Sequence, residues 1–333
     1  MARLKIDDMH KIITTKLLQD VEEDHISCSN EKTYKLEDYD TLKRLKYKSE
    51  YIVDNDTIAV HFVLDDSNYI LITGDFSLEN PIDVEQDEPF LFSAIANSKK
   101  INKKKGTNPH EITNILDVDE NEIDFYRIKD FFPSFSVTKY PQTNSENPDN
   151  ILYDFVLSTI LKNKYHNLSF NQEITTTLSD ILNVTNKRAL PYENFINAYL
   201  EHSWKFSYLC LYRCLEPFYS IVWVDKMNTI FQNRDENYCK YTNEIAEYSR
   251  KVKHETEIFN IMTEHYSDNE TKDLYSLRNS IVHNKLEEMT KSIKFDNFTD
   301  DDWNKYISAI LNLIKDLYSK YTEEYINLCE HYL

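Results

Sequence analysis

The stretch TIAVHFVLDDSNYILIT, Thr57 to Thr73, decides the fold class of the first half of the chain. Both of its arms are rich in β-branched and aromatic residues, which favour strands. The polar DDSN between the arms is typical of a hairpin turn. We therefore predict an antiparallel pair of strands over Thr57–Leu64 and Tyr69–Thr73.

More strand-like runs flank this hairpin. Tyr51–Val53 precedes it, and Phe90–Ile95 and Ile123–Ile128 follow it. An amphipathic helix is expected over residues 4–23, where apolar residues recur at helical spacing. Together these segments predict an N-terminal β-rich domain over residues 1–140.

A polar loop, SKKINKKKGTNPHE, separates two of these predicted strands. Its lysines are open to two interpretations, a solvated loop or a contact for a partner or nucleic acid. They are Lys99, Lys100, Lys103, Lys104 and Lys105.

The composition changes at YPQTNSENPDN, which has two prolines, several asparagines and almost no apolar residue. Such a composition is typical of a linker, which we place at residues 141–150. From residue 151 to residue 333 the apolar residues recur at helical spacing, and residues 192–333 are expected to form the core of a bundle. The predicted fold class is α+β, a β-rich domain followed by an all-α helical bundle.

The helical domain is expected to contain several long helices. Two helices, over 151–165 and 174–184, precede a long one that begins at Pro191 and runs until Pro217 ends or kinks it. Others are expected over 238–264 and from Thr299 onward, because Thr299 and three aspartates form a favourable helix start. The last helix carries an apolar seam that requires a partner helix: Trp303, Ile307, Ile310, Ile314, Leu317, Tyr321 and Leu328.

The bulk properties exclude several classes of protein. A net charge of −19 disfavours nonspecific electrostatic binding of nucleic acid over a broad surface, so any nucleic-acid binding must be confined to a local site. With 2 glycines the chain has no phosphate-cradling glycine-rich loop. Five cysteines without a CxxC pair or clustered histidines indicate reduced thiols rather than a zinc site or disulfide framework. The sequence has no long apolar run, so it predicts a soluble cytoplasmic protein with no membrane association. The missing glycine-rich loops and metal-ligand clusters predict that it has no cofactor.

Candidate functional residues gather in LYSLRNSIVHNK, Leu274 to Lys285, which we expect to open a long helix. Arg278 is permanently charged, Asn279 follows it directly, and His283, five positions on, titrates near neutrality. This arrangement would occur by chance roughly 0.02 times in such a chain. Glu216, in the run LYRCLEPFY of the first long helix, is the fourth candidate.

These residues resemble the HEPN superfamily, whose members are helical bundles with an Arg, four to six residues and then a His, often with Asn directly after the Arg. The resemblance covers residues 192–333, and Glu216 is similar to a polar residue on the first bundle helix. By layout alone, the β-rich domain before the bundle resembles the ApeA-type anti-phage arrangement. The resemblance implies a metal-independent endoribonuclease, often dimeric, of toxin, abortive-infection or antiviral defence systems.

The chemistry can also be derived from the residues. On a helix Asn279 and His283 share a face, whereas Arg278 is rotated by roughly 140° from His283. Two copies around a two-fold axis would gather both sets of side chains in one cleft, which favours a homodimer. RNA carries its own 2′-hydroxyl nucleophile, so cleavage requires proton transfer by His283 and charge stabilisation by Arg278, with Asn279 orienting the histidine or a phosphate oxygen. The expected partners are RNA, tRNA or single-stranded loops, and a phage-derived trigger at the N-terminal domain.

Other interpretations stay open at this point. Arg278 could pair with Asp273 or Glu287, and His283 could be a satisfied histidine at a helix interface. The bundle could bind RNA, a nucleotide or a toxin without cutting, or act as a structural adaptor through its acidic surface. The role of Glu216 is equally open, because a charge before a proline near a helix end is often merely solvated.

Overall fold

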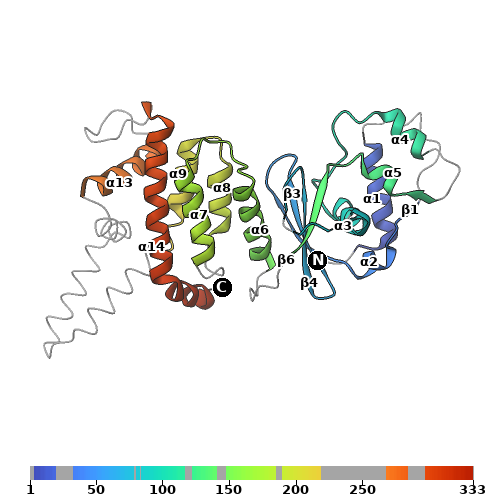
Figure 1. Ribbon diagram of the computed structural model, residues 1–333, viewed down its shortest axis with the longest axis horizontal. Coiled ribbons are helices and arrows are strands. Elements are labelled where there is room, and N and C mark those ends of the chain that lie inside the picture. The colour runs from blue at the N-terminus through green and yellow to red at the C-terminus, as the bar shows by residue number, and fades with distance from the viewer. Residues whose placement is uncertain are drawn as a thin grey trace. The chain divides into compact units, whose positions relative to one another are not determined.

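The computed structural model describes residues 4–19, 33–78, 80–82, 84–116, 122–140, 148–184, 190–218, 268–283 and 297–332. Contacts within the chain divide it into two compact units, Met1–Asn163 and Lys164–Leu333. Strands occur in the first unit, and the described part of the second unit contains helices only, so the protein is α+β as expected (Figure 1).

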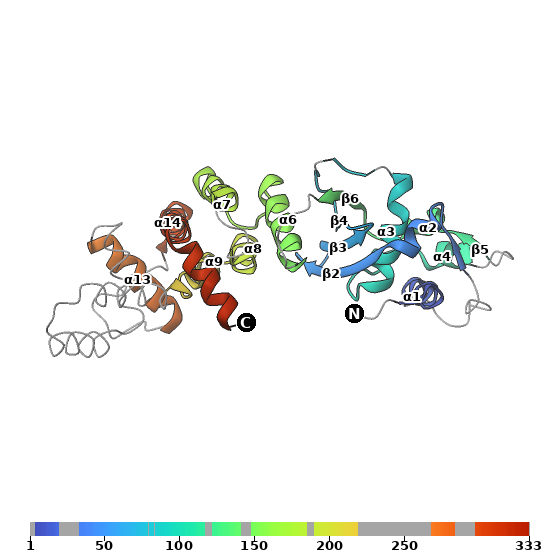
Figure 2. The same cartoon turned by 90° about the horizontal axis from the view of Figure 1, so that it is seen from below.

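The first unit combines a four-stranded antiparallel sheet, in the order β2-β3-β4-β6, with a parallel pair of strands, β1 and β5. Helices surround the sheet on both faces (Figures 1 and 2). The elements are α1 (Ile6–Leu18), β1 (Thr33–Lys35), α2 (Tyr39–Arg44), β2 (Lys46–Ile52), β3 (Ile58–Leu64), β4 (Ser67–Thr73), α3 (Val84–Asn97), α4 (Pro109–Leu116), β5 (Glu122–Asp124), α5 (Tyr126–Lys129), β6 (Phe135–Tyr140) and α6 (Pro148–Lys162).

The predicted hairpin is confirmed as β3 and β4, with a turn shorter than expected. Leu64 pairs with Ser67, so only Asp65 and Asp66 form the loop. Both have positive φ, 48° and 62°, as a two-residue hairpin turn of type I′ requires. Aspartate tolerates this left-handed conformation better than most residues, which explains why the tight turn forms without glycine.

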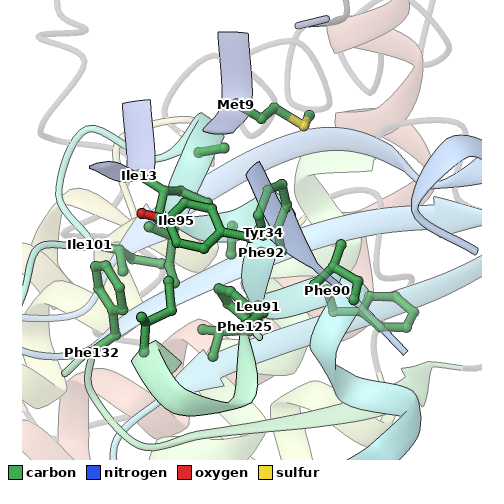
Figure 3. Close-up of a cluster of buried hydrophobic side chains, with 14 of the residues drawn as sticks. Met9, Ile13, Tyr34, Phe90, Leu91, Phe92, Ile95, Ile101, Phe125 and Phe132 are labelled. Atoms are coloured by element: carbon green, nitrogen blue, oxygen red, sulfur yellow. The ribbon is translucent and has the colours of Figure 1, made fainter. Parts of the chain in front are cut away.

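The two faces of the sheet pack against different helices. Alternate residues of β3, such as Val60 and Phe62, face a core that α1 and α3 complete (Figure 3). On the opposite face, the ring of Tyr51 lies 5.2 Å from that of Tyr153 on α6. The Tyr140 hydroxyl also donates a hydrogen bond to the buried Asp154 carboxylate of α6. Helix α6 therefore belongs with the sheet.

The contacts place the division between the units after Asn163, whereas the sequence places a linker at 141–150. Within that linker, Pro148 already begins α6, and residues 141–147 lie outside the described residues. The amide nitrogen of Ser77 donates to the Asn163 side chain at 3.0 Å, which attaches the chain just after α6 to the first unit.

The prediction of a strand over Phe90–Ile95 is wrong, because these residues form the middle of α3. Every residue from Asp87 to Ala96 is buried, so this part of the helix has no solvent-exposed face. A continuous apolar run of this length does not distinguish a buried strand from a buried helix. Similarly, Ile123–Ile128 is strand only up to Asp124 and then turns into α5.

Two lysines of the predicted polar loop have structural roles. The Nζ atom of Lys103 donates hydrogen bonds to the carbonyl oxygens of Leu17, at 3.1 Å, and Gln19, at the end of α1. Lys104 donates in the same way to the Asp130 carbonyl at 3.0 Å. A cation at the C-terminal end of a helix also opposes the negative end of its dipole. These two lysines therefore hold the loop to the unit rather than extending freely into solvent.

A buried histidine connects α1 to β1. The Tyr34 amide donates a hydrogen bond to Nδ1 of His10 at 3.1 Å, and the Tyr34 hydroxyl lies 2.9 Å from Thr14 Oγ1. Burial lowers the pKa of His10, and Asp7 offsets only part of this effect. Since Nδ1 must be unprotonated to accept the bond, His10 is neutral in the folded protein.

Acidification is expected to destabilise the first unit through His10. Its folded pKa lies below the ordinary 6.5, so the unfolded chain takes up the proton first. Stability from this group is therefore complete above pH 6.5 and declines as the pH falls. Circular dichroism melts at about pH 7.5 and about pH 5.5 should show a larger loss of Tm for the wild type than for His10→Gln, whose amide oxygen still accepts from Tyr34 but does not titrate. Equal losses would contradict this role of His10.

The second unit contains α7 (Gln172–Val184), α8 (Tyr192–Leu200), α9 (Trp204–Arg213), α13 (Asp268–His283) and α14 (Asp300–Tyr332). The single long helix predicted from Pro191 to Leu215 is wrong, since residues 201–203 separate α8 from α9. Pro217 lies in a turn after α9, which agrees with its expected effect. The helix expected over 238–264 lies outside the described residues.

The start of α14 agrees with the sequence-based prediction. The backbone nitrogen of Thr299 donates to the Asp302 carboxylate at 2.9 Å, and the Asp302 nitrogen donates back to Thr299 Oγ1 at 3.3 Å. This reciprocal pair satisfies backbone donors at the helix start. The predicted seam from Trp303 to Tyr321 is buried, and α14 packs against α7 and α9. The side chain of Leu328 lies outside those described.

Among the described helices, none has the length and apolar character needed to cross a bilayer.

Candidate functional site

Helix α13 carries Arg278, Asn279 and His283 on one continuous helical segment. Ten helical residues, 268–277, precede Arg278. The expectation that the motif opens the helix is therefore wrong, because the helix already begins at Asp268. The helical backbone keeps Asn279 and His283 on one face, one turn apart, with Arg278 on an adjoining side.

Helix α13 is held in place by its packing against α9 (Figure 2). Leu274 and Leu277 are buried, at 2% and 0% exposure, and form its inward side. The Tyr208 hydroxyl of α9 donates a buried hydrogen bond to the Leu274 carbonyl at 2.7 Å. Burial raises the pKa of Tyr208 well above its ordinary value, so this hydroxyl keeps its proton. The contact fixes the helix one turn before Arg278.

The Arg278 guanidinium contacts Asn279 and Tyr212. Its Nη1 donates a hydrogen bond to Oδ1 of Asn279 at 2.9 Å. Its Cζ lies over the ring of Tyr212, 5.6 Å from the centroid, within the range of a cation–π interaction. Of the alternative partners for Arg278, Glu287 and the side chain of Asp273 lie outside the described residues.

The bond between Arg278 and Asn279 determines which way the amide faces. Arginine only donates, so the Asn279 atom facing it must be the oxygen. The Asn279 nitrogen, which carries two donor hydrogens, therefore points elsewhere. Both side chains are half-buried. Together they present donors and a permanent positive charge, which suits a phosphate or another oxyanion.

His283 is the last residue of the described part of α13, and its side chain is not among those described. In the structure, a hydrogen bond joins the side chains of Arg278 and Asn279, and the backbone of His283 lies one helical turn beyond Asn279.

Glu216 lies in the turn after α9, where its backbone nitrogen donates to the Arg213 carbonyl at 3.2 Å. Its side chain is exposed. The same turn joins Tyr212 to Phe218, so Glu216 follows directly on the helix that supports Arg278. An exposed carboxylate fits the solvated alternative as well as a catalytic one.

Tyr208 and Tyr212 are the residues that sequence reasoning missed. Both lie on α9, four positions apart, and both are buried. Their spacing is visible in the sequence, but aromatic residues at helical spacing indicate an ordinary core. Only the packing of α13 against α9 reveals that one tyrosine binds the backbone of α13 and the other lies under Arg278.

The two cysteines of α9 and its following turn are free thiols. Burial raises the pKa of both Cys210 and Cys214, which makes them poor nucleophiles. Among the described residues no three histidine, cysteine or acidic side chains are grouped as metal ligands.

Comparison with known proteins yields no match: no family model, no curated protein and no solved structure is similar to this chain.

Proposed function

We propose that the second unit is a metal-independent endoribonuclease of the HEPN type. The single observation that carries this proposal is the donor pair of Arg278 and Asn279, ordered by a 2.9 Å bond on the same helix as His283. A preordered positive donor pair suits the phosphate of a nucleic acid, and a histidine one turn away suits proton transfer.

The reaction that these residues suit is attack by the RNA's own 2′-hydroxyl on the adjacent phosphorus. The P–O5′ bond breaks as the new bond forms, which leaves a 2′,3′-cyclic phosphate and a 5′-hydroxyl. In this proposal His283 takes part in the proton transfer that activates the 2′-oxygen or releases the 5′-oxygen. Arg278 and the Asn279 nitrogen stabilise the charge that develops on the phosphate oxygens. DNA lacks the nucleophile and would be spared.

One helix does not direct all three side chains at a single point, because Arg278 and His283 are about 140° apart around it. We therefore propose a homodimer in which two copies of α13 complete one cleft. The net charge of −19 supports such a concentrated site, since a chain this acidic must bind RNA locally. Sedimentation tests this point, and a strict monomer that cleaves RNA would contradict it.

The RNA is expected to be tRNA or another RNA with single-stranded loops, where unstacked bases are accessible. The first unit would serve as the sensor, responding to a phage-derived trigger, so that cleavage acts in abortive infection or growth arrest. The alternative is a bundle that binds RNA or a partner protein without cutting it.

Purified full-length protein incubated with total tRNA and EDTA tests the proposal. We expect cleavage that leaves cyclic phosphate ends, and no cleavage of DNA oligonucleotides of matched sequence. Failure to cut RNA at any protein concentration, or equal cutting of DNA, would exclude this ribonuclease mechanism and favour a binding function.

A further inference from the structure

The ring of Tyr212 forms one wall around the Arg278 guanidinium. It is 3% exposed, so its position is fixed by the surrounding core of the second unit. The guanidinium carbon lies 5.6 Å from the ring centroid. The second contact, the Asn279 oxygen at 2.9 Å, comes from α13 itself, whereas the ring comes from α9.

These two contacts differ in what they can restrain. Asn279 neighbours Arg278 on the same helix, so their bond moves with α13 and limits only the local rotamer. The ring of Tyr212 belongs to another helix and restrains the guanidinium relative to the rest of the unit. The π face of a buried ring attracts a cation and favours a defined position over it. Arginine stacked in this way loses less freedom when its remaining donors bind an anion.

Helix α9 restrains the side chain of Arg278 through Tyr212 and also restrains the backbone of α13 through Tyr208. Tyr208 lies one turn before Tyr212, with the ring centroids 6.2 Å apart, and its hydroxyl binds the Leu274 carbonyl of α13. Tyr208 therefore sets where the helix backbone lies, and Tyr212 sets where the charged end of Arg278 lies.

We infer that Tyr212 is a positioning residue for Arg278, which holds the guanidinium in place for a phosphate of bound RNA. The inference deepens the proposed ribonuclease function and rests on it for the identity of the ligand. The restraint acts through the face of the ring and does not require the hydroxyl.

Binding of a 2′-O-methyl RNA, which cannot be cleaved, tests the inference apart from catalysis. Fluorescence anisotropy should show that Tyr212→Leu and Tyr212→Met weaken binding about tenfold, equivalent to about 1.4 kcal/mol and between the values for exposed and desolvated cation–π contacts. Tyr212→Phe keeps the ring and should bind within about twofold of the wild type. Methionine, being unbranched and adaptable, gives a second folded variant should leucine disturb the core.

The coupling to Arg278 is tested with double variants. In an Arg278→Ala background, Tyr212→Met should have no further effect on RNA binding. Tyr199→Leu is the matched control, because Tyr199 is also buried in the second unit but stacks on Phe170 at 5.1 Å. It should lower the Tm without weakening RNA binding.

Three results would overturn the inference: equal binding by Tyr212→Phe and Tyr212→Met, an undiminished effect of Tyr212→Met without Arg278, or wild-type RNA affinity independent of Arg278. If the wild type binds RNA through Arg278 but never cleaves it, the ribonuclease proposal fails, and the inference is then decided by the binding constants alone.

Discussion

Replacing Arg278 by alanine should reduce RNA cleavage by about 10²- to 10³-fold, the usual effect of removing one preorganised donor from a developing oxyanion. The guanidinium supplies a permanent positive charge to the proposed site, and the Asn279 oxygen would lose its donor at the same time. Arg278→Lys keeps the charge but not the planar fork, so it should recover only part of the activity. The measurement is kcat/KM on a labelled tRNA, with folding checked by circular dichroism.

His283→Ala is the companion variant. Loss of a proton-transfer group typically costs about 10²- to 10⁴-fold, so cleavage should again be nearly abolished. Arg213→Ala provides the matched control, because Arg213 is an exposed arginine on α9 and has no place in the proposed mechanism. Its activity and its toxicity in bacteria should equal those of the wild type. If Arg278→Ala and His283→Ala cleave like Arg213→Ala, the site has been assigned incorrectly.

Replacing Phe92 by alanine should destabilise the first unit by about 3–5 kcal/mol, as removal of a large buried ring usually does. Phe92 is fully buried on α3 (Figure 3). Its ring lies 5.1 Å from that of His10 and 5.2 Å from that of Phe125, so it joins α1, α3 and the segment between β5 and α5. The loss should be measured by urea unfolding followed by circular dichroism.

The position of the tryptophans makes this experiment selective. All 3 tryptophans, Trp204, Trp223 and Trp303, belong to the second unit, so their fluorescence reports on that unit. The fluorescence transition should be unchanged in Phe92→Ala, while the circular dichroism transition of the first unit moves to lower urea. Phe206→Ala, at a phenylalanine with 59% exposure, should change stability by no more than about 0.5 kcal/mol. A loss below about 1 kcal/mol in Phe92→Ala would contradict the role of α3 as the centre of this core.

The sequence predicted those elements whose signals are local. The β3–β4 hairpin is predictable because runs rich in β-branched and aromatic residues flank a polar turn, and the start of α14 because Thr299 and Asp302 can cap each other. The sequence of α3 predicts a strand, because burial on all sides of its middle removes the polar stripe that marks a helix. The helical spacing of apolar residues, which is the signal for a helix, arises only where one side of the element is exposed to solvent.

The break between α8 and α9 is determined by tertiary contacts. No glycine or proline marks residues 201–203. The end of α8 is held by the Asn167 side chain, which donates to the Leu200 carbonyl at 2.6 Å. The start of α9 is held by Trp204, whose Nε1 donates to Asp300 at 2.9 Å. These partners lie far away in the sequence, so the local sequence pattern predicts one helix over the residues of both α8 and α9.

The candidate site shows the same division. A helical Arg-Asn pair with a His one turn beyond could be predicted from spacing alone, and the helix is confirmed. The supporting roles of Tyr208 and Tyr212 could not be predicted in this way, because Tyr208 forms its hydrogen bond with Leu274, which lies 66 positions further along the sequence. Contacts of this kind depend on how helices pack, which no short motif encodes.

The outer strand β2 bears on how copies of this protein can associate. It carries Lys46 and Lys48 with exposed side chains, and its register with β3 shifts between Tyr47 and Ser49. Lysines and an irregular register on an outer strand hinder a second sheet from adding on by strand pairing. Growth of the sheet from one molecule into the next is therefore disfavoured along β2.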